Sequence, residues 1–349
     1  MGQSVTLVGA MSTLAMGQQH YESQITQALQ SRPHTDWALS SRRIVSWHSQ
    51  IEGSVRLPTR PLWNAPFALV APLAQRAYGR ADLIHRLDLR LPPRLGREII
   101  TIHDLPPLRF PDEGNLPRWA AKGARRSAGV ICPSEFAADE VSSLLKIRRV
   151  WVIPYGVASA FLEPNPMGDQ ELKELRVSRP FVLHAAGATQ RKNLSSLATA
   201  WKEVASSAPE ATLVMCGPLD SRRDRLFASL PRVRLLGQLE LQAVARLMQA
   251  ATLVVVPSLY EGFGLPALEG MAAGVPVVAA NCAALPEVCG SAALLVPPTP
   301  AGLADGIMEV LEQREVETRL RHDGKSRAAL FTWERAASAT IAAYREAMG

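Results

Sequence analysis

Residues 254–280 read VVVPSLYEGFGLPALEGMAAGVPVVAA. An apolar, β-branched run ends at Pro257, and a glycine-bearing loop follows it. Pro266 stands where a helix can begin, because a proline ring suits the first helical turn and its missing N–H costs nothing there. A second apolar run, PVVAA, starts at Pro276. The stretch therefore predicts a buried strand, a loop, a helix and a second buried strand.

Short apolar runs of the same kind recur along the chain, with helical stretches between them. Continuous rather than alternating hydrophobicity indicates strands buried on both faces, and alternation with helices indicates parallel sheets. The runs are VTLVGA from Val5, DLIH from Asp82, EIITIH from Glu98, GVICP from Gly129, VWVIP from Trp151, FVLHAA from Phe181, ATLVMCG from Ala211, VRLLG from Val233, TLVVVP from Thr252, PVVAA from Pro276 and ALLVP from Ala293. We predict an α/β protein with two Rossmann-like, doubly wound domains.

The length of 349 residues suits two domains. Residues 158–180, ASAFLEPNPMGDQELKELRVSRP, contain prolines and charges but no strand-like run, so we place the linker there. We expect an N-terminal domain over residues 1–165, a C-terminal domain over 166–328 and a final helix over 329–349 that packs back on the first domain. A cleft between the domains would face the carboxyl ends of both sheets, where such folds bind ligands.

Composition excludes several classes of protein. Hydrophobic residues make up 47% and charged residues 20%, so the chain is neither disordered nor collagen-like. The net charge of +6 comes from the first half: residues 1–165 hold 19 Lys and Arg against 13 Asp and Glu, whereas residues 166–349 hold 19 of each. We expect an anionic acceptor or an anionic membrane surface at the first half. Only the pI of 9.4 suggests nucleic acid, and without interleaved aromatic and basic residues we expect none.

The sequence also predicts a reduced, cytoplasmic protein. No apolar run approaches the ~18–20 residues that cross a bilayer, and the first residues lack a basic region of the signal-peptide kind. None of the cysteines has metal-ligand spacing; they are Cys132, Cys216, Cys282 and Cys289.

Residues 60–80, RPLWNAPFALVAPLAQRAYGR, are apolar with an arginine at each end. They either form a buried connecting segment of the first domain, or lie on a membrane surface, or line an acceptor groove. The prolines at 61, 66 and 72 weaken a continuous amphipathic helix.

The loop after Pro257 carries the strongest functional signal. A helix amino terminus flanked by glycines exposes backbone N–H groups and the positive end of the helix dipole, which suits a diphosphate. Glu261 lies in the loop, and we expect Glu269 in the first turn of the helix. Alone, each is an ordinary loop or helix-start residue. Beside an anion site, their carboxylates more plausibly accept hydrogen bonds from sugar hydroxyls than hold phosphate.

Two further turns carry chemistry-bearing residues. In AAGATQRKNLSSLATAW, residues 185–201, Arg191 and Lys192 are adjacent cations at the end of a strand, and Asn193 can cap the helix that follows. Such a pair suits a leaving diphosphate, although an ordinary solvated turn is the alternative. In ITIHDLPPLRFPD, His103 ends a buried strand whose carboxyl end should open onto the same cleft as Glu261. A lone histidine there is as often structural as functional.

These elements together resemble the retaining GT-B glycosyltransferases of family 4. The resemblance rests on Glu261-x7-Glu269 within EGFGLPALE, the RKN turn, the HD at a strand end, the PSEF helix start at Pro133 and the closing FTWERAA. It implies the GT-B fold, a nucleotide diphosphate-sugar held mainly by the second domain, and no cofactor or metal requirement.

Position by position, the resemblance implies donor-site roles. Arg191 and Lys192 would neutralise the diphosphate, and Glu269 would bind the ribose hydroxyls. His103 would approach the donor sugar near the reacting carbon. The donor sugar itself would be held by Glu261 and by the backbone of Phe263, Gly264 and Leu265. Gly17 stands alone where many family members have paired glycines, and it still lets the backbone approach the donor.

We therefore expect hexosyl transfer from a nucleotide diphosphate-sugar, with a family-level preference for GDP-mannose, to a hydroxyl of a glycan or lipid-linked acceptor. Because no motif residue is an obvious nucleophile, we expect front-face displacement with retention, in which the departing diphosphate helps to deprotonate the acceptor. The alternative is a GT-B protein that binds a nucleotide-sugar without transfer, as a regulatory or partner subunit. An oxidoreductase would need G-x-G-x-x-G after the first strand, where the chain reads GAMSTLAMG.

Overall fold

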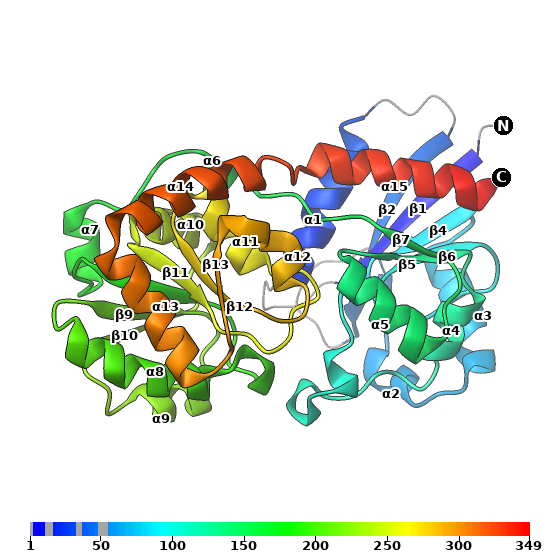
Figure 1. Cartoon of the computed structure of the whole chain (residues 1–349). Helices are drawn as coiled ribbons and strands as arrows, with labels where there is room; N and C mark the ends of the chain where they lie inside the picture. The colour runs from blue at the N-terminus through cyan, green and yellow to red at the C-terminus, as the bar shows by residue number, and fades with distance from the viewer. Residues whose placement is uncertain (1–2, 11–16, 33–36, 48–54) are drawn as a thin grey trace. The chain divides into compact units, whose positions relative to one another are not determined.

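The computed structural model describes residues 3–10, 17–32, 37–47 and 55–349 (Figure 1). The chain divides into two compact units. Unit 1 comprises Met1–Gly156 and Thr332–Gly349, and unit 2 comprises Val157–Phe331. Each unit contains one parallel sheet, and every expected strand is present. The predicted doubly wound α/β fold is confirmed.

Unit 1 is built on a seven-stranded parallel sheet with the order β3-β2-β1-β4-β5-β6-β7. Its strands are β1 (Gln3–Ala10), β2 (Trp37–Ser46), β3 (Val55–Leu57), β4 (Leu83–Arg86), β5 (Glu98–Thr101), β6 (Gly129–Cys132) and β7 (Val150–Val152). Its helices are α1 (Gly17–Gln30), α2 (Thr59–Trp63), α3 (Phe67–Tyr78), α4 (Ala120–Arg126), α5 (Glu135–Leu145) and α15 (Trp333–Met348), with short 3-10 turns η1 (Pro106–Leu108) and η2 (Pro111–Glu113).

Strands β2 and β3 were not expected from the sequence. β2 reads WALSSRRIVS, and its middle residues are exposed or only partly buried. A strand with polar side chains on one face does not show the continuous hydrophobicity that marks the central strands. β3 has three residues, too few for a periodic signal.

The final helix packs on unit 1, as predicted. Helix α15 lies beside α1, which Figure 1 shows in red and blue. Tyr344 of α15 reaches the sheet, where its hydroxyl lies 2.6 Å from Nδ1 of His85 on β4. Its ring also meets Trp37 of β2 edge to face, with the ring centroids 5.6 Å apart. The C-terminal helix therefore completes the hydrophobic covering of the first sheet.

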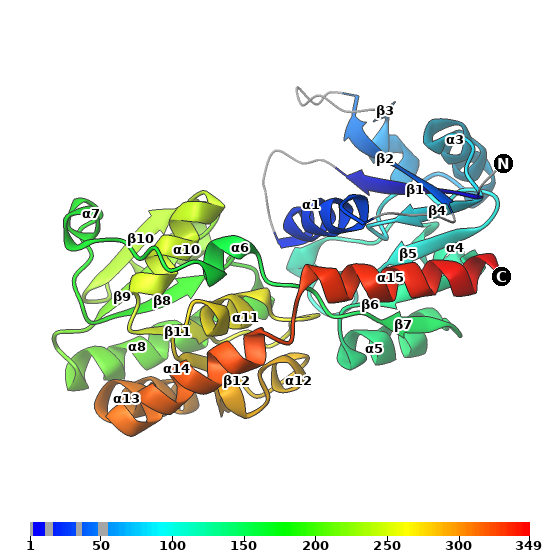
Figure 2. The same cartoon turned by 90° about the horizontal axis from the view of Figure 1, so that it is seen from above.

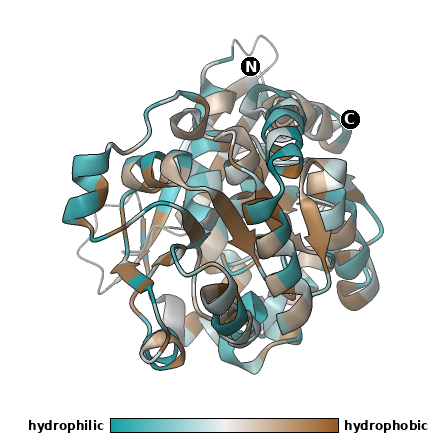
Figure 3. Ribbon diagram, turned by 60° about the vertical axis from the view of Figure 1, so that its left-hand side comes forward, coloured by the Kyte–Doolittle hydropathy of each residue, from teal (hydrophilic) through white to brown (hydrophobic). Residues whose placement is uncertain are grey.

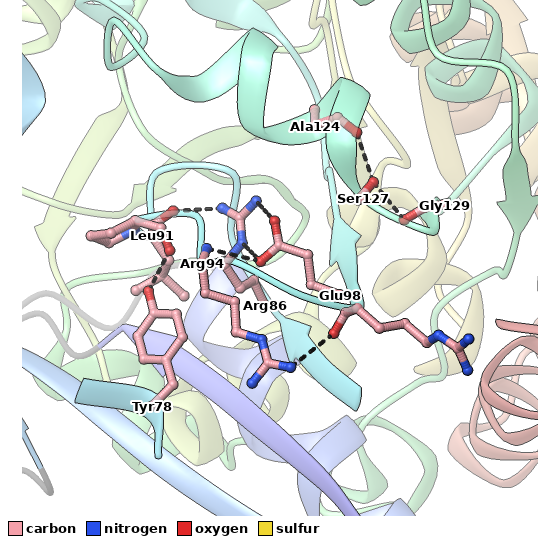
Figure 4. A network of polar contacts seen from close by, with 10 residues as sticks. Tyr78, Arg86, Leu91, Arg94, Glu98, Ala124, Ser127 and Gly129 are labelled. Carbon is pink, nitrogen blue, oxygen red and sulfur yellow. Dashed lines mark hydrogen bonds and ion pairs between the residues drawn. The ribbon is translucent and has the colours of Figure 1, made fainter. Parts of the chain in front are cut away.

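A buried ion pair fixes the loop between β4 and β5 (Figure 4). The guanidinium of Arg86 donates Nε to Oε2 and Nη2 to Oε1 of Glu98, each at 3.0 Å, and both side chains are almost fully buried. Arg86 Nη1 also donates to the carbonyl of Leu91 at 2.5 Å, and the backbone N–H of Arg94 donates to Glu98 Oε2 at 3.3 Å. Removing one partner of such a pair typically costs 3–5 kcal/mol of stability. The two-pronged contact thus ties Leu91 and Arg94 of the loop to the end of β4 and the start of β5.

Unit 2 is built on a six-stranded parallel sheet with the order β10-β9-β8-β11-β12-β13. Its strands are β8 (Phe181–Ala185), β9 (Thr212–Cys216), β10 (Val233–Gly237), β11 (Leu253–Val256), β12 (Val277–Ala280) and β13 (Leu294–Val296). Its helices are α6 (Ser159–Leu162), α7 (Asp169–Glu174), α8 (Leu194–Ser207), α9 (Ser221–Phe227), α10 (Leu241–Ala250), α11 (Leu265–Ala272), α12 (Leu285–Cys289), α13 (Pro300–Glu312) and α14 (Arg314–Ala328), with 3-10 turns η3 (Gln190–Lys192) and η4 (Gly290–Ala292).

Helices cover both faces of the second sheet. Figure 2 shows α8 and α13 on one side and α6 and α10 on the other. Residues of α8 and α13 form one core cluster with β8, β9 and β11. In Figure 3 the hydrophobic colour concentrates on the strands, whereas the helices carry both colours.

The expected linker belongs to unit 2. Residues 158–180 carry α6 and α7, and the division falls after Gly156 rather than after residue 165. The physical reason is a set of contacts with α10: Arg246 binds both carboxylate oxygens of Glu171, and Met167 N donates to the carbonyl of Arg246 at 3.0 Å. The second division falls after Phe331, at the N-cap of α15, rather than after residue 328.

Both sheets have a point at which the order of their strands reverses. In unit 1 this point lies between β1 and β4, and in unit 2 it lies between β8 and β11. The loops that leave two such strands diverge to opposite faces of the sheet, which opens space for a ligand at the carboxyl edge. These two edges are therefore where ligand-binding residues are expected.

Candidate active site

The reversal point of unit 2 brings together two loops that are distant in sequence. Arg191 and Lys192 lie in η3, which follows β8, and Glu261 lies in the loop that follows β11. A backbone hydrogen bond joins the loops, because Leu259 N donates to the carbonyl of Arg191 at 2.7 Å. The adjacency of β8 and β11 thus places the two predicted motifs side by side.

Three charged side chains meet there. Lys192 Nζ lies 2.5 Å from Oε1 of Glu261, and Arg191 Nη1 lies 3.2 Å from Oε2. Arg191 Nη1 also donates to the carbonyl of Tyr260 at 3.3 Å. The exposed fractions of the side chains are 9% for Lys192, 15% for Arg191 and 8% for Glu261. We call these three residues the ion cluster.

The ion cluster keeps Glu261 ionised. Burial alone would raise the pKa of Glu261, but the charges of Lys192 and Arg191 outweigh it and lower the pKa to about 2. The cluster contains two cations and one anion, so its net charge is positive. Such a site attracts anions while it also presents a carboxylate that can accept hydrogen bonds.

Asn193 does not cap α8 with its side chain, contrary to the prediction. It occupies the N-cap position with φ 54°, and its side-chain amide donates instead to the carbonyls of Pro257 and Pro298, at 3.0 and 2.9 Å. Left-handed backbone of this kind is most accessible to Asn among residues with a side chain. Asn193 therefore ties the turn after β8 to the end of β11, a link that residue type alone did not reveal.

The loop that carries Glu261 ends in a helix start, as expected. Gly264 is the N-cap of α11 with φ 99°, which favours glycine, and a Cβ there would lie 2.7 Å from Leu285 Cδ2. Pro266 is the second residue of the helix, and Phe263 packs edge to face on Phe331. The backbone of residues 263–265 is thus held at the amino end of α11, on the same loop as Glu261.

Glu269 lies in the second turn of α11, not in its first turn as predicted, because the helix begins at Leu265. Burial raises the pKa of its carboxyl to about 7. No Lys or Arg side chain pairs with it within the described ranges. Its negative charge contributes, after burial, to the raised pKa of Cys216, the last residue of β9. Glu269 is therefore a carboxyl whose pKa lies near neutral pH, in the helix that follows β11.

His103 lies in unit 1, just after β5, and both of its ring nitrogens have partners there. Nε2 lies 2.9 Å from the carbonyl of Leu87, and Nδ1 makes a short contact with the hydroxyl of Tyr155. A carbonyl only accepts, so Nε2 carries the proton and Nδ1 accepts from Tyr155. Burial lowers the pKa of His103 to about 4. The ring is a neutral, fixed group rather than a ready proton acceptor.

The first unit also holds polar residues that the sequence did not single out. At its reversal point, Glu22 of α1 sits against Gly9, where a Cβ would lie 2.4 Å from Oε2 of the carboxyl. Gln18 donates to Glu22 and accepts from Arg90, and Arg90 pairs with Asp88. Burial, with the nearby charge of Asp88, raises the pKa of Glu22 to about 8. Gln18 and Glu22 follow β1, and Asp88 and Arg90 follow β4. Their positions after these two strands were the sequence feature that could have singled them out.

The predicted Gly17 is the first residue of α1. Residues 11–16, which join it to β1, lie outside the described residues. The structure therefore gathers Arg191, Lys192 and Glu261 in unit 2, and it places Gly17 and His103 in unit 1.

Residues 179–313 match the model of the family described as glycosyl transferases group 1. This range covers the sheet of unit 2, the ion cluster and the start of α11. Unit 2 thus carries the likeness to this family, and the chain is a glycosyltransferase.

Two curated relatives resemble the glycosyltransferase over most of its length. The O-antigen chain mannosyltransferase B of Escherichia coli is 28% identical over 314 residues, which are 83% of this chain and 81% of that protein. A GDP-mannose-dependent alpha-(1-6)-phosphatidylinositol dimannoside mannosyltransferase of Mycobacterium tuberculosis is 28% identical over 280 residues, which are 75% of this chain and 72% of that protein. The sucrose-phosphate synthase of Thermosynechococcus elongatus superposes with a TM-score of 0.75 over 99% of this chain and 98% of that one, at 23% identity. The GT-B fold is confirmed.

The described part of the glycosyltransferase has no group of three or more His, Cys, Asp or Glu side chains that could hold a metal ion. All four cysteines are free. No described helix has both the length and the hydropathy to cross a membrane.

The hydrogen bonds and the burial of His103 lead to a prediction that NMR can check. In the glycosyltransferase labelled with nitrogen-15 histidine, His103 should stay neutral with the proton on Nε2 down to about pH 4, because burial disfavours the imidazolium. Tyr155→Phe removes the donor to Nδ1 and should shift the Nδ1 resonance. Protonation of His103 at pH 6 would contradict the assignment.

Proposed function

We propose that this glycosyltransferase moves a hexose from a nucleotide diphosphate-sugar to a hydroxyl of a glycan or lipid-linked acceptor, with retention of configuration and without a metal ion. The observation that carries the proposal is the ion cluster of Arg191, Lys192 and Glu261. Buried cations beside a helix amino terminus suit a diphosphate, and the ionised glutamate suits the hydroxyls of the sugar attached to it.

Mannose is the sugar we propose, with GDP-mannose as the donor. The support is that both curated relatives are named mannosyltransferases and that one of them is named GDP-mannose-dependent. The residues of the ion cluster and Glu269 bind groups that every nucleotide diphosphate-sugar carries. The base and the sugar are therefore the parts of the donor that the proposal takes from the relatives.

The chemistry follows from where charge develops. The bond between the anomeric carbon and the diphosphate oxygen breaks, and Arg191 and Lys192 stabilise the negative charge that gathers on the leaving group. The acceptor hydroxyl attacks from the same face and passes its proton to a phosphate oxygen. Glu261 orients the sugar, because at a pKa of about 2 it stays ionised and accepts from sugar hydroxyls. His103 is neutral and is held by Tyr155 and the carbonyl of Leu87, so it does not take the proton.

The proposal is tested by product stereochemistry. Purified protein is incubated with GDP-mannose and a panel of mannosyl glycan and lipid-linked acceptors, and the anomeric configuration of the product is read by NMR. We expect an α-linked product from the α-linked donor. A β-linkage would exclude the front-face mechanism, and release of nucleotide from UDP-glucose but not from GDP-mannose would exclude mannose.

Lys192→Met should lower turnover by ~10²–10³, the usual effect of removing one preorganised charge at a developing anion. The side chain of Lys192 is buried, so methionine is chosen to keep its volume and apolar stem. The matched control is Lys202→Met, at an exposed position of α8, the helix that follows η3. This change should leave turnover unchanged. Near-normal turnover in folded Lys192→Met would remove the diphosphate role.

Glu269 should make nucleotide affinity depend on pH. Its pKa of about 7 means that the carboxylate form is populated above neutrality, and a carboxylate is a stronger acceptor for ribose hydroxyls than a carboxylic acid. Calorimetric titration with GDP should therefore show weaker binding at pH 6 than at pH 8. Glu269→Gln should bind more weakly at pH 8 and lose that part of the pH dependence. The nucleotide's own phosphate titration is common to both proteins, so identical pH profiles would refute the ribose role.

A further inference from the structure

Helix α3 in unit 1 is apolar on both of its faces. Its buried face consists of Val70, Ala71, Ala74 and Tyr78. Leu69, Pro72 and Leu73 follow helical spacing on another face, and they are exposed; the exposed fractions of the two leucines are 63% and 49%. A helix that is hydrophobic all round is normally buried in a core or in lipid. Among the described residues, no side chain covers this face to the extent found in the core.

Cations stand at both ends of the helix. At its start, Lys122 Nζ and the guanidinium of Arg126, both from α4, lie 5.2 and 5.4 Å from the ring centroid of Phe67. At its end, Arg76 and Arg80 are exposed. We call Leu69, Pro72 and Leu73, together with these four cations, the α3 surface. A helix of 12 residues is ~18 Å long, so the cations bracket a short apolar stripe.

The segments that form α3 and α4 contain no carboxylates, and Asp82, two residues after Arg80, accepts hydrogen bonds from Ser4. Residues 55–81 and residues 114–134, which supply α3 and α4, include no Asp and no Glu. Within the described ranges, none of the four cations pairs with a carboxylate from elsewhere in unit 1. An apolar stripe bracketed by cations that form no ion pair within the described ranges matches an anionic, apolar partner in both charge and hydropathy.

We propose that the α3 surface docks on an anionic lipid bilayer. Shallow insertion suits a short helix whose backbone is already held by a buried face, and it places two leucines below the headgroups. The cations would lie at the level of the lipid phosphates, with the stems of their side chains along the apolar stripe. A protein partner with one flat interface would need acidic residues to match the cations at both ends. The proposal rests on unit 1 alone and does not depend on the donor chemistry.

For residues 60–80 the structure shows the buried connecting segment, and it leaves an exposed apolar face on the same helix. Val70, Ala71 and Ala74 make α3 a buried connecting helix of the first sheet, and Leu69 and Leu73 make it an exposed apolar surface. The prolines are accommodated: Pro66 is the N-cap of α3, and Pro72 lies within the helix on its exposed face.

The test is sedimentation of the purified full chain with vesicles. One set contains phosphatidylcholine alone, and the other contains phosphatidylcholine with phosphatidylglycerol. We expect binding to the anionic set only, weakened by salt. Leu69→Ser with Leu73→Ser should weaken binding by about tenfold or more, because burying a single leucine is worth at least that factor. Lys122→Gln with Arg126→Gln should weaken it about fivefold per cation at low salt.

The matched control changes two exposed leucines outside the α3 surface. Leu144→Ser on α5 and Leu162→Ser on α6 replace side chains that are 46% and 52% exposed, and together they should leave vesicle binding unchanged. Equal loss in this control would overturn the proposal. So would equal binding to both vesicle sets, absence of binding by the unaltered chain, or a dimer in solution that the Leu69 and Leu73 changes dissolve.

Nucleotide binding separates this proposal from the proposed function. Stabilisation by GDP in a thermal-shift assay should be the same in the unaltered chain and in the variant at Leu69 and Leu73, which also shows that the variant is folded. Loss of vesicle binding with this stabilisation kept supports the docking surface. If the unaltered chain fails to bind vesicles but is stabilised by GDP, the surface is rejected and the transferase proposal stands.

Discussion

A glutamate shared between two cations at the edge of a parallel sheet governs the site of unit 2. Taking such charges out of water is costly, and hydrophobic residues of similar size often give a more stable protein. The ion cluster of Arg191, Lys192 and Glu261 is therefore difficult to explain by stability alone. Its net positive charge suits the diphosphate of the proposed donor, and a carboxylate whose pKa is lowered by Lys192 and Arg191 suits the hydroxyls of the sugar.

The cluster exists because of the order of the strands. Arg191 and Glu261 are separated by 70 positions, yet their loops follow β8 and β11, which are neighbours only because the strand order reverses between them. Buried apolar runs predict the strands, and a doubly wound sheet predicts that the loops at the reversal point share an edge. For this reason the convergence of the RKN turn and the EGFGLP loop was predictable from the sequence, whereas the ion pair itself was not.

What the sequence could not provide depends on side-chain direction and on exact element ends. Asn193 has the residue type of a helix cap, but left-handed backbone turns its amide towards Pro257 and Pro298. Glu269 falls in the second turn because α11 starts one residue before Pro266. Tyr155 follows β7 without any motif, and only the fold brings its hydroxyl to His103. Strand β2 was not predicted, because the polar residues on one of its faces interrupt the continuous hydrophobicity used to find strands.

The residues at which the chain leaves and re-enters unit 1 help to hold His103 in place. The chain leaves unit 1 after Gly156 and returns at Thr332, and these points touch: a Cβ on Gly156 would lie 2.3 Å from the backbone nitrogen of Trp333. Tyr155 precedes that glycine, and its ring lies nearly parallel to the indole of Trp333, with centroids 6.2 Å apart. The same tyrosine donates its hydroxyl to His103. The helix that closes the first sheet therefore also holds Tyr155, and through Tyr155 it helps to fix the ring of His103.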